Sequence, residues 1–152
     1  MNKILNYTLL LFLFTLFGCG FKPILTSKGY QFSININTIS GDQKVNSIIT
    51  NRFKSLKENE NKYDLNLSSK KIKKIISKDS KGDTTMFELV IDIKYNVEKS
   101  GEIIIQNTIK ERTTYNNITD KFELENYENN IIDNLSNKIS NKIISSISDI
   151  DQ

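Results

Sequence analysis

Residues 87–97 read FELVIDIKYNV, the most regular alternation of apolar and polar side chains in the chain. Every odd-numbered residue is apolar, and four of the five even-numbered ones are charged or carry an amide (Glu88, Asp92, Lys94 and Asn96). Successive side chains of a β-strand point to opposite faces, so this pattern predicts a strand with one buried face and one face in water. Such a strand is typical of a sheet that is covered on one side only.

The segment that follows continues the pattern. Residues 99–102 read KSGE and predict a tight hairpin turn. We expect the returning strand to run from Ile103 to about Thr114, with Ile103, Ile105 and Ile109 on one side. These two strands form an antiparallel hairpin of the predicted sheet.

Two more strands are predicted upstream. Tyr63, Leu65 and Leu67 alternate with polar residues, and this strand continues through a lysine-rich segment to a turn at residues 78–83. An earlier strand is predicted over residues 30–39, where aromatic and isoleucine side chains alternate with Gln, Ser and Asn.

Two helices are predicted where the apolar spacing changes to three or four residues. The first follows Asp42, which can cap it, and is expected to end near residues 59–61. After a polar connection at residues 115–118, Thr119 or Asp120 can cap a second helix, whose apolar stripe runs to Ile150.

The predicted order is therefore β-α-β-β-β-α. Burying both helix stripes on one face of a four-stranded, mostly antiparallel sheet gives a two-layer α/β sandwich of the α+β class. We assign residues 30–152 to this single domain, residues 19–29 to an extended leader and residues 1–18 to a cleaved segment.

The N-terminus reads MNKILNYTLLLFLFTLFGCG, a basic start followed by an apolar run and small residues, which is typical of a secretory signal peptide. The single cysteine, Cys19, stands at the expected cleavage point, and residues 16–19 (LFGC) resemble the lipobox of bacterial lipoproteins. That resemblance implies cleavage before Cys19 and acylation of its thiol and new amine. More than one acyl chain gives stable membrane anchoring. An uncleaved anchor, or an ordinary signal peptide with a chance cysteine, is the alternative.

Composition excludes several classes of site. The chain has no histidine, and its one cysteine is expected to carry lipid, which excludes zinc sites, Cys–His nucleophiles and Ser-His-Asp triads. Carboxylates such as Asp92, Glu98, Glu111, Asp120 and Glu123 are expected on exposed faces, and no Gly-rich phosphate loop occurs. We therefore expect no enzyme activity and no cofactor besides the covalent lipid on Cys19.

The net charge also indicates which classes of partner the protein can bind. It is +3, and residues 1–18 contain Lys3 and no acid, so the mature chain carries 3 − 1 = +2. A chain this close to balance does not suggest a nucleic-acid binder.

The segment at residues 18–23 (GCGFKP), followed by this order of elements and by Tyr115-Asn116 before the last helix, resembles the LptE family of lipopolysaccharide-assembly lipoproteins, particularly its alphaproteobacterial form. The resemblance implies a lipid-anchored protein on the periplasmic side of the outer membrane. It further implies that the domain plugs the lumen of the β-barrel protein LptD, and that the pair delivers lipopolysaccharide to the outer leaflet.

One concentrated charge feature could contact lipopolysaccharide. The lysines between positions 70 and 81 could attract the phosphates of a polyanionic glycolipid. They are Lys70, Lys71, Lys73, Lys74, Lys78 and Lys81. The alternative interpretation is a solvated edge strand whose lysines discourage aggregation.

Two other functions stay open at this point. One is a periplasm-facing lipoprotein that binds a small ligand or lipid between helices and sheet, without any role in barrel assembly. The other is an uncleaved accessory domain of an inner-membrane machine.

Overall fold

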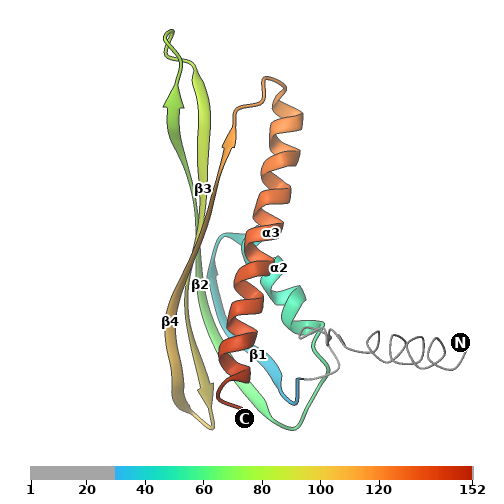
Figure 1. Ribbon diagram of the computed structural model, residues 1–152. Coiled ribbons are helices and arrows are strands. Elements are labelled where there is room, and N and C mark those ends of the chain that lie inside the picture. Colours follow the sequence, from blue (N-terminus) through green and yellow to red (C-terminus); the bar gives the residue numbers. More distant parts are fainter. Residues whose placement is uncertain (1–29, 152) are drawn as a thin grey trace, which may run out of the picture.

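The computed structural model describes residues 30–151, which form one sheet and two helices (Figure 1). The elements in chain order are β1 (Ser33–Gly41), α2 (Gln43–Lys54), β2 (Lys62–Lys78), β3 (Thr84–Lys99), β4 (Glu102–Asn116) and α3 (Lys121–Ser148). The predicted order and the α+β class are confirmed. The expected signal peptide (residues 1–18) and lipidated leader (residues 19–29) lie outside the described residues.

The strands lie in the order β1-β2-β3-β4. Strand β1 runs parallel to β2, whereas β2 pairs with β3 and β3 with β4 in antiparallel fashion. The parallel pair exists because α2 returns the chain to the end of the sheet from which β1 started. The sheet is therefore mixed and mostly antiparallel, as predicted.

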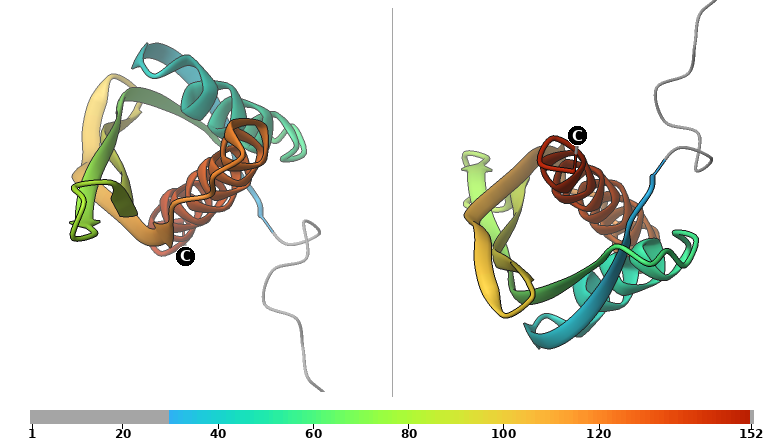
Figure 2. Two further views of the ribbon diagram at one scale, coloured as in Figure 1. Left: turned by 90° about the horizontal axis from the view of Figure 1, so that it is seen from above. Right: turned by 90° about the horizontal axis from the view of Figure 1, so that it is seen from below.

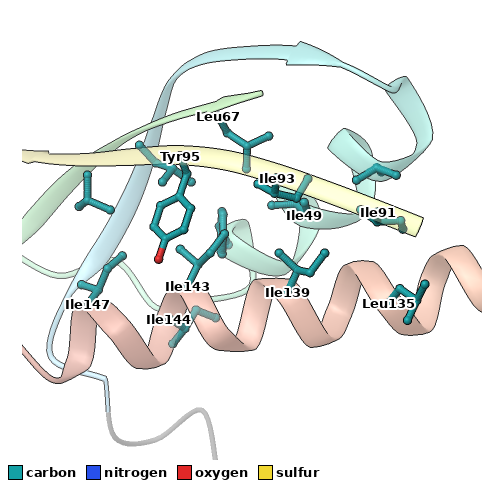
Figure 3. Close-up of a cluster of buried hydrophobic side chains, with 14 of the residues drawn as sticks. Ile49, Leu67, Ile91, Ile93, Tyr95, Leu135, Ile139, Ile143, Ile144 and Ile147 are labelled. Carbon is teal, nitrogen blue, oxygen red and sulfur yellow. The ribbon is translucent and has the colours of Figure 1, made fainter. Parts of the chain in front are cut away.

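Both helices lie on the same face of the twisted sheet (Figure 2). Between the layers, odd-numbered residues of β3 meet the apolar stripe of α3, and the side chains of Ile91, Ile93, Ile139 and Ile143 are fully buried (Figure 3). Ile49 of α2 completes this core. Burial of an isoleucine side chain contributes about 1.5–3 kcal/mol, so these contacts offset the poor helix propensity of the Asn- and Ser-rich α3.

The predicted caps and hairpin turn are present. The Asp42 carboxylate accepts a hydrogen bond from the backbone N–H of Val45 (3.1 Å) at the start of α2, and Asp120 caps α3. At the β3–β4 turn, Ser100 and Gly101 both have positive φ (54° and 85°), the backbone that two-residue hairpins require.

Three predictions about element ends were wrong. Helix α2 ends at Lys54 instead of near residues 59–61, because residues 57–62 (KENENK) offer no apolar side chain to bury another turn. Strand β1 begins at Ser33, although Phe32 is already buried. Tyr115 does not belong to a polar connection: it lies within β4 and is 5% exposed.

Strand β4 also differs from prediction near its start. Val97 pairs with Ile105 and Glu98 with Ile103, so Ile104 is an extra residue. Such a bulge breaks the alternation, so the residues on its two sides point to opposite faces of the sheet. Ile103 consequently leaves the face that Ile105 and Ile109 share, and it is 56% exposed.

Candidate functional site

The distal hairpin, residues 70–88, comprises the end of β2, the start of β3 and the turn between them. Figure 1 shows this turn at the opposite end of the sheet from the Ser100–Gly101 turn. The Asp79 carboxylate closes it by accepting hydrogen bonds from the backbone N–H groups of Lys81 and Asp83, both at 2.9 Å. Every residue from Lys73 to Asp83 is exposed, so the tip extends beyond the buried core.

The six predicted lysines all lie on the distal hairpin, but they do not form one patch. Lys71 points to the helix side, where its ammonium lies 3.0 Å from the Asp42 carboxylate. Lys73 also points to that side and pairs with Glu128 of α3. Their neighbours point to the opposite face because side chains alternate along a strand.

On that outer face, Lys74 lies 3.8 Å from Glu88, and Lys70 is directly opposite Asp92 on β3. Lys78 and Lys81 stand at the turn and form no ion pair with any residue in the 30–151 range. Lys70 likewise forms no ion pair among the described residues, so three of the six predicted lysines lack an ion-pair partner: Lys70 on the outer face, and Lys78 and Lys81 at the turn.

The tip also exposes two apolar side chains that sequence reasoning did not single out. Ile75 and Ile76 are 55% and 49% exposed, beside a register shift between Ile75 and Ser77. The signal was present in the sequence, since two consecutive isoleucines in a strand cannot both face one core. Together with Lys78 and Lys81, they make the tip amphiphilic.

A polar network joins the base of the distal hairpin to α3. The hydroxyl of Tyr115 donates a hydrogen bond to Glu128 Oε1 (2.7 Å), and the Lys73 ammonium reaches the same oxygen. The Lys73 Nζ also lies 4.0 Å from the centre of the Phe87 ring, a cation–π contact. Burial, together with the hydrogen bond to Glu128 and its charge, raises the pKa of Tyr115 well above its ordinary value, so this hydroxyl remains a donor.

The outer face of the sheet is polar and partly ordered by ion pairs. Lys110 Nζ lies 2.9 Å from Asp92, whose side chain is only 19% exposed, and Glu88 is similarly covered between Lys74 and Arg112. We expected this whole face to meet water, but its carboxylates are largely covered by their lysine and arginine partners.

The expectation that Glu111 lies on an exposed face was wrong: it is 7% exposed on the helix side, beside two lysines of α3.

An open groove of about 560 Å³ crosses this outer face and is lined mainly by amide and hydroxyl side chains of all four strands. It does not lie between helices and sheet, where the small-ligand alternative placed its site. Buried isoleucines of β3 and α3 fill that interlayer space (Figure 3).

No group of three or more acidic, His or Cys side chains in residues 30–151 is arranged to hold a metal ion. Neither α2 nor α3 is long and apolar enough to cross a membrane. Cys19, the predicted lipidation site, lies outside the described residues.

No protein-family model matches the sequence, and no curated protein matches it. The fold does match solved structures. Rare lipoprotein B from Shewanella oneidensis superposes with a TM-score of 0.57 at 14% identity, over 78% of this chain and 100% of that one. An uncharacterized lipoprotein B from Nitrosomonas europaea gives 0.58 at 12% identity, over 86% and 91% of the two chains. A minor lipoprotein from Acinetobacter baumannii gives 0.51 at 14% identity, over 78% and 93%.

Proposed function

We propose that this protein is an LptE-type lipoprotein of the alphaproteobacterial form, anchored through Cys19 to the periplasmic side of the outer membrane. It partners an LptD-like β-barrel, plugs its lumen and assists the delivery of lipopolysaccharide to the outer leaflet. The proposed role is non-catalytic and needs no cofactor besides the covalent lipid.

The observation that carries the proposal is a fold likeness combined with a lipobox. Rare lipoprotein B is a member of the LptE family, and the described domain of this chain spans the whole of its solved structure. The lipobox is a sequence feature of residues 16–19, whereas the fold likeness is a likeness of three-dimensional structure. Two different kinds of observation therefore support the same kind of protein.

The distal hairpin supports the lipopolysaccharide part of the proposal. Lipid A carries phosphates next to acyl chains, and its binding needs cations beside apolar surface. Lys78 and Lys81 supply ammonium groups, and Ile75 and Ile76 supply exposed apolar area at the same tip. Ammonium–phosphate hydrogen bonds are among the stronger ones available to a protein.

The outer face of the sheet supports the plug role. The lumen of a large outer-membrane barrel is polar, so a protein that fills it needs a polar exterior. This face offers amides and hydroxyls across all four strands, and ion pairs that join β2, β3 and β4. Such groups can exchange hydrogen bonds with a polar barrel wall.

Mass spectrometry of the mature N-terminus, combined with separation of inner and outer membranes, tests the anchor. We expect a triacylated Cys19 in the outer-membrane fraction, and a Cys19→Ser variant that is neither acylated nor retained there. An intact Met1, or wild-type protein found with the inner membrane, would favour the inner-membrane accessory domain instead.

A further inference from the structure

Glu128 lies between two donors of the sheet that converge on one of its oxygens. The Lys73 ammonium (2.5 Å) and the Tyr115 hydroxyl (2.7 Å) both contact Oε1. Lys73 comes from β2 and Tyr115 from β4, so the carboxylate of α3 bridges two strands that do not pair with each other.

The two donors have the properties of an anion site. Lys73 is held in place by the Phe87 ring beneath its ammonium, and Tyr115 is packed between the rings of Phe87 and Tyr127, at 5.6 and 5.9 Å. A positioned ammonium and a positioned hydroxyl aimed at a single oxygen atom suit a phosphate oxygen as well as a carboxylate oxygen.

We propose that Lys73 Nζ and Tyr115 OH form a phosphomonoester site at the base of the distal hairpin, and that Glu128 closes this site as an internal competitor. The inference rests on the proposed function and deepens it, because it names one contact point for a phosphate and the residue that controls access to it.

The competitor can be displaced without leaving a buried charge. The side chains of Lys73 and Glu128 are 39% and 19% exposed, so Glu128 can turn into solvent when a ligand takes its place. A phosphomonoester carries more negative charge near neutral pH than a carboxylate, which favours the exchange. Tyr115 is only 5% exposed, so its hydroxyl needs the incoming phosphate oxygen as an acceptor once Glu128 has turned away.

The test compares the detergent-solubilised full protein with its Glu128→Gln variant. Two probes separate the possible sources of phosphate: glucosamine 1-phosphate free in solution, and phosphatidylcholine vesicles containing diphosphoryl lipid A. We expect Glu128→Gln to bind roughly three- to tenfold more tightly, because the internal competitor has lost its charge. A gain with the free phosphomonoester identifies phosphate alone as sufficient, and a gain only with vesicles identifies the lipid headgroup as the ligand.

Two controls isolate the site. Glu125→Gln removes the same charge from an exposed position on α3 and should leave affinity unchanged. Adding Lys73→Gln to Glu128→Gln should abolish the gain. If glutamine at position 128 lowers the thermal midpoint, Glu128→Ser is measured in its place.

The proposal is overturned if Glu128→Gln binds no better than Glu125→Gln, or if its gain survives the loss of Lys73. Wild-type binding to lipid A vesicles without any gain in Glu128→Gln would remove this inference alone. The proposed function is judged separately, by association with a β-barrel.

Discussion

Glu111 shows how the inner face of the sheet accommodates a charge. Lys138 and Lys142 of α3 place their ammonium groups 2.8 and 2.6 Å from its two carboxylate oxygens. Burial alone would raise the pKa of the Glu111 carboxyl, but the hydrogen bonds from both lysines and their positive charges hold it below its usual value of 4.5. The bridge ties α3 to the edge strand β4.

We expect Glu111→Gln to lower the free energy of unfolding by about 1–2 kcal/mol at neutral pH, a range discounted because both lysines are more than half exposed. Because the folded-state pKa is depressed, the wild type holds its full advantage above pH 4.5 and loses it as pH falls through that lower pKa. Urea denaturation of both proteins at about pH 6 and about pH 3 measures the change. An equal difference at both pH values would contradict this assignment.

Gly41 is required at the end of β1 by a close approach of backbone. Its φ is +100°, and a Cβ atom there would lie 1.9 Å from the carbonyl oxygen of Ser69. Gly82 in the distal hairpin has a similar φ of +91°, but a Cβ there would meet nothing within 4 Å. A side chain at Gly41 would therefore meet both an unfavourable φ and a steric clash, whereas one at Gly82 would meet the unfavourable φ alone.

Gly41→Ala should cost more than about 2 kcal/mol of stability, since the strand must move away from β2, whereas Gly82→Ala should cost about 1 kcal/mol for conformation alone. Midpoints of urea denaturation provide the comparison. Equal losses in the two variants would mean that β1 does not approach Ser69 so closely.

At the scale of elements, the sequence predicted what depends on local periodicity. The strand at residues 87–97 and the hairpin turn at Ser100–Gly101 follow from alternation and turn chemistry within a few residues. The caps Asp42 and Asp120 were readable for the same reason.

Contacts between distant elements were not predictable in this way. The burial of Glu111 depends on which face of α3 meets β4, and the bulge at Ile104 shifts the face of Ile103. The meeting of Lys73, Tyr115 and Glu128 joins three elements far apart in the chain. The sequence placed Lys70 to Lys74 on one strand, but it did not show which carboxylates of other elements their side chains meet.

The distal hairpin can be tested as an element. Lys78→Ser combined with Lys81→Ser should weaken lipopolysaccharide binding by the purified protein roughly fivefold or more, because these ammonium groups are available to phosphates. Lys57→Ser with Lys62→Ser is the matched control: it removes the same charge from two exposed positions, one in the loop between α2 and β2 and one at the start of β2. Calorimetry or a fluorescent lipopolysaccharide competition assay measures the affinities. An equal loss of affinity in the two double variants would mean that only the net charge of the protein matters, and not the position of the lysines.

The apolar half of the same tip has its own prediction. Ile75→Ser with Ile76→Ser should weaken binding of intact lipopolysaccharide and leave binding of its delipidated oligosaccharide unchanged, because the isoleucines would contact acyl chains. Both side chains are about half exposed, so their replacement should leave the thermal midpoint within a few degrees of the wild type. Unaltered binding of the intact glycolipid would limit the tip's contribution to its lysines.

At the scale of the whole domain, the two parts of the proposed function fall on different surfaces. The helices bury the inner face of the sheet, the polar outer face stays open, and the distal hairpin extends from one end (Figures 1 and 2). A polar outer surface suits a barrel lumen, and an amphiphilic tip suits a glycolipid. The sandwich itself acts as the rigid body that holds both surfaces in fixed relation.

The central claim is the association with an outer-membrane β-barrel. Affinity capture of the tagged, full-length protein from detergent-solubilised envelopes tests it, with the captured proteins identified by mass spectrometry. We predict that an LptD-like β-barrel is recovered in near-equal amount and that lipopolysaccharide is recovered with it. Recovery of the acylated protein alone from the same extracts would contradict the claim.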